Sequence, residues 1–149
     1  MRFWRISDFA DLSGQGGVLD AGRWHSIGRP VVYLSDHPAS ALLEIIVHLE
    51  VDPEELPDSF QLLTVEAPDD VAFDVVEAAT LPEEWRASPD STQGIGTRWL
   101  DEARTALLRV PSAIVPFAWN WLLNPAHRDM PRLGIANIAR VAFDPRLFT

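Results

Sequence analysis

The sequence predicts an α+β fold in a single domain that spans residues 1–149. The first observation is the length of 149 residues, which suits one domain and lets roughly 68–70% of the unfolded surface be buried. The second is the order of the predicted elements, because strands and helices are interspersed without regular βαβ alternation. The third is a composition of 47% apolar and 23% charged residues, which is typical of globular proteins.

The first part of the chain is predicted to contain two strands separated by loops. Residues 2–6 form the first strand, and residues 31–34 form a short, β-branched second strand. Residues 12–22 are rich in glycine and are predicted to be a mobile loop, and residues 28–30 a turn. The glycines lack the strand-then-helix setting of a dinucleotide-binding fingerprint, so they are not identified as one.

A helix is predicted after the second strand. Ser35 or Asp36 can cap it and Pro38 suits its first turn, and we expect it to end near Glu50, before Pro53. Three- and four-residue spacing gives it an apolar stripe with a polar stripe beside it. The apolar stripe comprises Ala41, Leu42, Ile45 and Leu49, and the polar stripe comprises His37, Ser40, Glu44 and His48.

The second half of the chain is predicted to contain a further helix and several strands. The helix would turn Trp99, Leu100, Ala103 and Leu107 inward. In order, the predicted elements are strands at residues 60–66 and 71–75, an irregular segment at 81–92, the helix at 97–109, a strand-like run at 111–117 that prolines interrupt, a turn at 124–125 and a strand at 138–143.

The composition excludes several chemistries. All twelve basic residues are arginines, and the chain has neither lysine nor cysteine. A phosphate-binding loop lysine, a Schiff base, a thiolate nucleophile and a cysteine metal site are therefore excluded. The net charge of −10 argues against direct binding to nucleic acid or to an anionic membrane. The absence of cysteine, and an N-terminus without the apolar segment of a signal peptide, predict a cytoplasmic protein.

Arg23, Tyr33 and Glu44 are the first candidate site residues. The arginine can bind phosphate oxygens through two donors; the alternative is a surface salt bridge, which is the commoner role of an isolated arginine. The tyrosine can stack on a base and hydrogen-bond a ribose, or it can be a strand residue with an exposed hydroxyl. The glutamate lies among apolar residues and must be at a boundary, paired with His48, or functional. Arg5, within the first predicted strand, is a second arginine candidate.

A second group of candidates follows residue 110. Ser112 lies between two prolines, which fix the backbone, and Ser112, Asn120 and Asn124 could hydrogen-bond a sugar or an amide. Turn formation explains Asn124 before Pro125 equally well. His127 could be a ligand or a base, but no pair of histidines has metal-ligand spacing with a third ligand, so we predict no metal site.

A series of short strings along the chain carries a family resemblance. They are Trp4-Arg5-Ile6, Gly22-Arg23-Trp24-His25, Gly28, Pro30-Val31-Val32-Tyr33, Leu43-Glu44, Val110-Pro111-Ser112-Ala113-Ile114-Val115-Pro116, Asn120, Asn124-Pro125, His127 and Phe143-Asp144-Pro145-Arg146-Leu147-Phe148. In this order and spacing the chain resembles the RES domain toxins of bacterial type II toxin–antitoxin modules. The family is named for an arginine, a glutamate and a serine, which here correspond to Arg23, Glu44 and Ser112.

The resemblance implies a fold, an activity and a partner. The fold would be similar to that of ADP-ribosyltransferase toxins, with mixed or antiparallel sheets, flanking helices and NAD in a cleft. The activity would be consumption of NAD by hydrolysis or phosphorolysis; the alternatives are ADP-ribosylation of a protein and a non-catalytic role in a repressor complex. The partner would be an Xre-type helix-turn-helix antitoxin in a hetero-oligomeric complex. The implied active-site set is Arg23, Tyr33, Glu44 and Ser112, with Arg5 and Asn120 as further cleft residues.

The chemistry of NAD cleavage suits these residue types. Cleavage of the nicotinamide–ribose bond passes through an oxocarbenium-like state, and nicotinamide departs as a neutral molecule, so no general acid is needed. Glu44 can stabilise the developing cation, and Arg23, with Arg5, can bind the pyrophosphate. Tyr33 or Trp24 can supply an aromatic wall. Ser112 can supply a polar contact to the carboxamide or the ribose.

Overall fold

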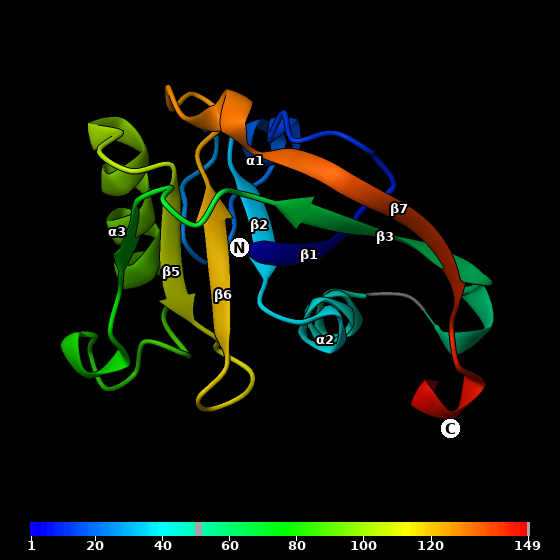
Figure 1. The fold of residues 1–149 in the computed structure, drawn as a ribbon. Helices are drawn as coiled ribbons and strands as arrows, with labels where there is room; N and C mark the ends of the chain where they lie inside the picture. Colours follow the sequence, from blue (N-terminus) through cyan, green and yellow to red (C-terminus); the bar gives the residue numbers. More distant parts are fainter. Residues whose placement is uncertain (50–51, 149) are drawn as a thin grey trace.

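The structure, a computed structural model, describes residues 1–49 and 52–148. Its α+β class is the one predicted. The order of elements along the chain is β1 (Arg2–Ile6), α1 (Gln15–Leu19), β2 (Val32–Ser35), α2 (Pro38–His48), β3 (Ser59–Glu66), β4 (Phe73–Val75), α3 (Pro89–Glu102), β5 (Leu107–Pro111), β6 (Trp119–Leu123) and β7 (Gly134–Ala142) (Figure 1). Short 3₁₀ turns lie at Pro53–Glu55, Ala78–Thr80, Met130–Arg132 and Pro145–Phe148.

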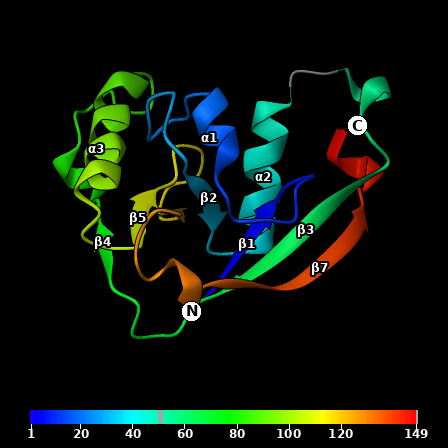
Figure 2. The same ribbon diagram turned by 90° about the horizontal axis from the view of Figure 1, so that it is seen from above.

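The described strands form one sheet in the order β4-β5-β6-β2-β1-β3-β7. The β4–β5 pair is parallel and the other pairs are antiparallel. The two halves of the sheet meet weakly, since in the described chain β1 and β2 pair only where Trp4 lies opposite Ser35. By contrast, β1 pairs with β3 along its whole length, from Arg2 to Ile6. The sheet therefore opens between β1 and β2, and α1, α2 and α3 all lie on one side of it (Figure 2).

Alternation along the central strands produces a core on each face of the sheet. Leu107 on β5 and Leu123 on β6 belong to one buried cluster, whereas Leu108 and Leu122 belong to another, which includes Trp99 of α3. Successive side chains of a strand point to opposite faces, so these strands are apolar on both sides. They form the buried part of the sheet beside its open middle.

The predicted helix at 97–109 is wrong in position. The helix begins at Pro89, inside the segment predicted to be irregular, and ends at Glu102, where Ala103 adopts a left-handed conformation with φ 50°. Ala103 is exposed, and Leu107 is buried in a strand. A strand buried on both faces gives a continuous apolar run that periodicity cannot distinguish from a helix. Gly96 also argued against a helix in this segment, because glycine is a poor helix former. Here close packing requires the glycine, since a Cβ at this position would overlap the backbone carbonyl of Trp24.

Other boundaries also differ from the prediction. The glycine-rich loop contains the short helix α1, and the strand-like run at 111–117 is mostly the turn before β6, a strand that the sequence did not predict. The predicted strands at 71–75 and 138–143 are Phe73–Val75 and Gly134–Ala142. Those at 2–6 and 60–66 are confirmed, as is the turn after Asn124.

The helix that carries Glu44 forms as predicted, apart from its ends. Pro38 occupies the first turn, but the cap is His37, whose Nδ1 accepts a hydrogen bond from the backbone N–H of Ala39 (3.1 Å). Ser35 and Asp36, the predicted caps, instead turn to β6: Ser35 Oγ bonds Asn120, and Asp36 accepts from the indole of Trp121. The predicted end near Glu50 lies outside the described residues, and the last residue of the described helix is His48.

Candidate active site

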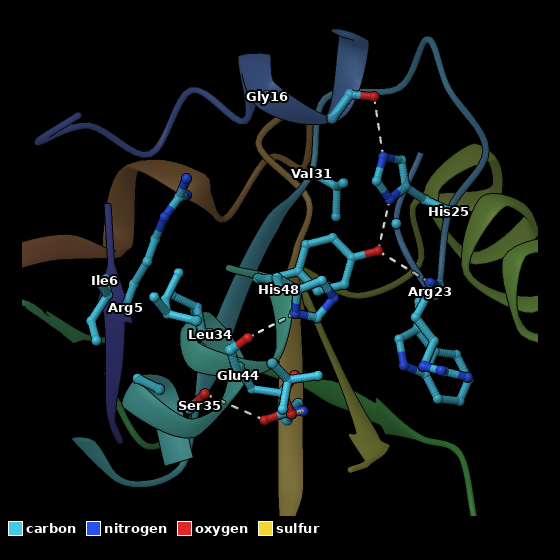
Figure 3. Close-up of a pocket in the computed structure, with 18 of the residues that line it drawn as sticks. Arg5, Ile6, Gly16, Arg23, His25, Val31, Leu34, Ser35, Glu44 and His48 are labelled. Atoms are coloured by element: carbon cyan, nitrogen blue, oxygen red, sulfur yellow. Dashed lines mark hydrogen bonds between the residues drawn. The ribbon is translucent and has the colours of Figure 1, made fainter. Parts of the chain in front are cut away.

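A cavity of about 410 Å³ lies where the sheet opens between β1 and β2. Its size falls in the range of sites for small ligands. Helix α2 and the segment around α1 complete its walls, and Arg5 and Arg23 approach from opposite sides in Figure 3. Of the seven predicted site residues, six line the cavity, namely Arg5, Arg23, Trp24, Tyr33, Glu44 and Asn120. Ser112, the seventh, reaches the site through Glu44.

The Glu44 carboxylate is held by two side chains from the β5–β6 half of the sheet. Oε1 accepts a hydrogen bond of 2.7 Å from Asn120 Nδ2 and a longer one, 3.5 Å, from Ser112 Oγ. The Ser112 hydroxyl is itself fixed, because it accepts from the backbone N–H groups of Ile114 and Val115 (3.1 and 3.2 Å). These donors hold the carboxylate in place at the cavity.

The Glu44–His48 side-chain pair, one of the alternatives from the sequence, is wrong. His48 Nδ1 lies 2.7 Å from the backbone carbonyl oxygen of Glu44 and not from its carboxylate. His48 lines the cavity, although no role beyond this pairing was predicted for it.

Ser35 is a further site residue that sequence reasoning treated only as a helix cap. Its hydroxyl lies 3.3 Å from Asn120 Oδ1, and the two residues are partners in the β2–β6 register. Because Asn120 uses its oxygen towards Ser35 and its amide N–H towards Glu44, the orientation of the amide is determined. A polar chain therefore runs from β2 through β6 to the carboxylate.

A second polar chain surrounds the Tyr33 hydroxyl. It accepts a hydrogen bond from the Trp24 backbone N–H (3.1 Å) and lies 2.7 Å from His25 Nδ1. His25 Nε2 faces the carbonyl oxygens of Gly17 (3.1 Å) and Asp20 (3.0 Å). Because carbonyls only accept, Nε2 carries the proton in the neutral ring, and Nδ1 then accepts from the Tyr33 hydroxyl.

The Tyr33 hydroxyl is thus occupied within the protein, and burial raises its pKa well above the ordinary value. Its ring faces the cavity as a wall, while the role of ribose partner, one of the sequence hypotheses, would require these bonds to break. The tie through His25 also anchors α1, which borders the cavity. Sequence reasoning missed His25 because two of its partners are backbone carbonyls of α1 and its C-cap, in a segment predicted to be a loop.

Arg23 is pre-positioned by backbone carbonyls. Its Nη1 donates to the carbonyl of Trp85 (3.3 Å) and its Nη2 to that of Arg86 (3.1 Å). The guanidinium carbon lies 6.0 Å from the centre of the Trp85 ring. Among residues 1–49 and 52–148 the partners of this guanidinium are uncharged carbonyls, so the alternative of a surface salt bridge is wrong.

Arg5 presents the opposite situation. It lies on β1 and lines the cavity, and within the described residues its Nη1 is buried without a hydrogen-bond partner. Burial lowers the pKa of Arg5, and the nearby charge of Asp11 opposes that shift. A buried, unpaired guanidinium is costly, so its position favours a site that receives an anion.

The remaining candidates have structural roles. The Trp24 ring is only 2% exposed and packs against Trp85, with ring centres 6.0 Å apart, so the aromatic wall is Tyr33. Asn124 is buried, with its amide donating to the Leu100 carbonyl and its oxygen accepting from the next turn. His127 is also buried and accepts from the backbone of Asp129. Neither Asn124 nor His127 lines the cavity.

Residues 1–49 and 52–148 contain no cluster of three or more His, Cys, Asp or Glu side chains placed to bind a metal ion. Within the same residues, every helix falls short of the length and apolar character needed to cross a membrane.

Comparison with known proteins matches this chain to one family over nearly its whole length. The RES domain model matches residues 2–144. A Pseudomonas putida protein named Toxin Res is 47% identical over 150 residues, covering 99% of this chain and 100% of that protein. A Sphingobium protein named Prs ADP-ribosylating toxin is 39% identical over 155 residues (97% and 95%). A Photorhabdus laumondii protein named Toxin Res is 40% identical over 139 residues (91% and 86%).

Proposed function

We propose that this chain, which belongs to the RES domain family, is a toxin that consumes NAD by cleaving the nicotinamide–ribose bond. The observation that carries the proposal is the placement of Glu44 in one cavity with Arg5 and Arg23. A dinucleotide brings a pyrophosphate for the arginines and a cationic nicotinamide riboside for the carboxylate. The names of the relatives support toxin activity.

The proposed mechanism requires stabilisation of a developing cation. As the bond to nicotinamide breaks, its electron pair moves to the ring nitrogen and positive charge appears on the ribose. The Glu44 carboxylate, already oriented by Asn120 and Ser112, faces that charge without reorganising. Arg5 and Arg23 bind the pyrophosphate from opposite walls, and the Tyr33 ring limits the movement of the bound substrate.

The experiment is release of nicotinamide from NAD by the purified protein, compared with Glu44→Gln. The amide keeps the shape of the side chain but removes its charge, so we expect a loss of about 10²–10³-fold in kcat with an unchanged fold by circular dichroism. Glu54→Gln, an exposed substitution in the 3₁₀ turn after α2, is the matched control. Wild-type protein that releases no nicotinamide, or a folded Glu44→Gln variant with full activity, would overturn the proposal.

A second candidate is transfer of ADP-ribose to a protein. It is favoured by the relative named Prs ADP-ribosylating toxin. NAD labelled in the adenylate half separates the two activities, because label on a protein indicates transfer and label only in small molecules indicates NAD degradation.

We also propose, from the family resemblance, that an Xre-type helix-turn-helix antitoxin is the physiological partner. Co-expression with that partner should then restore cellular NAD.

A further inference from the structure

His48 shares the cavity with the proposed catalytic carboxylate, and among the described residues its Nε2 has no hydrogen-bond partner. It lies four residues after Glu44 on α2, lines the same cavity, and is exposed to solvent (Figure 3). Its Nδ1 is 2.7 Å from the Glu44 backbone carbonyl. Since that carbonyl only accepts, Nδ1 carries the proton in the neutral ring. The Nε2 lone pair is then available to accept a proton from another molecule.

Cleavage of NAD leaves one proton to be removed. Nicotinamide takes the electron pair of the broken C–N bond and departs neutral. The acceptor, water or another O–H or N–H nucleophile, forms a bond to the ribose carbon with its own lone pair and must lose its proton. Glu44 is poorly suited to this second task, because its charge stabilises the cation and Oε1 is engaged by Asn120 and Ser112.

The other titratable groups lining the cavity are unsuited to be that base. His25 uses both ring nitrogens, towards Tyr33 and towards the carbonyls of Gly17 and Asp20, and is only 2% exposed. The Tyr33 hydroxyl is occupied as well, and Arg5 and Arg23 are cations. Asp20 belongs to the far end of the cavity, because its backbone carbonyl bonds His25, which lies well apart from Glu44 in Figure 3.

We propose that His48 is a catalytic general base, with Nε2 taking the proton of the nucleophile that receives the ADP-ribosyl group. The assignment rests on the proposed function and deepens it. The Glu44 carbonyl orients the ring through Nδ1, and the exposed position of His48 lets the imidazolium return its proton to solvent. Loss of a positioned general base costs about 10²–10⁴-fold in rate, and here the loss would fall on the acceptor step alone.

The test separates bond breaking from acceptor attack. Exchange of labelled nicotinamide into NAD requires only that the nicotinamide–ribose bond break and re-form, whereas product formation also requires deprotonation of the acceptor. His48→Asn keeps an N–H that can reach the Glu44 carbonyl but removes Nε2. We expect product formation to fall about 100-fold, exchange to stay within about threefold, and added imidazole to restore part of the product rate.

His37→Asn is the matched control, because His37 caps α2, does not line the cavity, and asparagine is a good cap. It should change neither rate. His48→Asn protein that forms product at the wild-type rate, or that loses exchange and product formation equally, would overturn the assignment. Wild-type protein that neither releases nor exchanges nicotinamide would overturn the proposed function itself, and this assignment with it.

Discussion

The two charged regions of the cavity differ in how well their hydrogen bonds are satisfied without a ligand. At the carboxylate end, Glu44 is bonded to Asn120, which is bonded in turn to Ser35. On the β1 side, Arg5 has a buried guanidinium nitrogen without a partner in the described chain. The carboxylate end is therefore organised in advance for charge stabilisation. The arginine side carries a desolvation cost that an incoming anion would relieve.

The largest effect is expected from Asn120→Asp, which removes the amide donor to the Glu44 carboxylate. A second carboxylate would lie against Oε1, where the amide now donates at 2.7 Å. Two carboxylates so close share a proton, so the single negative charge is divided between Glu44 and the new carboxylate. Glu44 also loses the amide donor that orients it towards the oxocarbenium ion. We expect kcat for nicotinamide release to fall about 10²–10³-fold.

Ser35→Ala is the control for that substitution, because it frees Asn120 Oδ1 but leaves the bond to Glu44. Loss of one neutral hydrogen bond, worth about 1 kcal/mol, should cost less than about tenfold. An Asn120→Asp variant as active as Ser35→Ala would show that the orientation and charge of Glu44 do not limit the reaction.

The next effect is expected at Arg5, whose replacement should raise the stability of the ligand-free protein but lower its affinity for NAD. Arg5→Met replaces the buried guanidinium by an apolar side chain of similar length, so we expect the ligand-free protein to gain about 1–3 kcal/mol in free energy of unfolding. NAD affinity should fall about 10–100-fold, the worth of a charged hydrogen bond. Denaturant unfolding measures the first quantity, and calorimetric titration in a Glu44→Gln background measures the second without turnover.

Arg2→Met is the matched control on the same strand. Arg2 is exposed and pairs with Glu66 at 2.9 Å outside the cavity, so its loss should change stability by less than about 1 kcal/mol and leave NAD affinity unchanged. If Arg5→Met instead destabilises the ligand-free protein, the buried guanidinium does not lower the free energy of unfolding. The two charged regions would then not differ in the way described above.

The sequence predicted the charged residues of the cavity better than the hydrogen bonds that hold the site together. Arg23 and Glu44 could be identified because their residue types and spacing fit a family pattern, and α2 because its proline and apolar stripe are local signals. Ser35 was missed as a site residue because its partner Asn120 is distant in sequence and is brought to it by strand register. His25 was missed because its carbonyl partners Gly17 and Asp20 belong to α1 and its C-cap, a segment predicted to be a loop. Helix α3 was misplaced because close packing of Gly96 on Trp24 is a tertiary requirement that reads locally as a helix breaker.

A smaller effect, on stability rather than catalysis, is expected at the second satisfied network. Tyr33→Phe removes the hydroxyl that bonds both the Trp24 N–H and His25 Nδ1. Leaving these groups unpaired should lower the free energy of unfolding by about 1–3 kcal/mol. The ring remains as the wall of the cavity, so NAD affinity should stay within about threefold. A loss of affinity without a loss of stability would mean that the hydroxyl serves the ligand rather than α1.

The smallest effect is a pH dependence of stability that can be attributed to a single side chain, Tyr33. Tyr33 is the only tyrosine, and the chain has no lysine or cysteine, so few other side chains titrate between pH 9 and 11. Burial raises the pKa of folded Tyr33 above its ordinary value of about 10. Folded Tyr33 therefore keeps its proton where the unfolded chain loses it, and its contribution to stability is full below pH 10 and declines above it.

The expected decline is at most about 1.4 kcal/mol per pH unit above pH 10. Denaturant unfolding at pH 9, 10 and 11 should show it in the wild type and not in Tyr33→Phe, and tyrosinate absorbance should appear only as the protein unfolds. Parallel stability curves for the two proteins would mean that the hydroxyl is open to solvent. The tie from Tyr33 through His25 to α1 would then not be a satisfied network, and only the carboxylate end would be organised in advance.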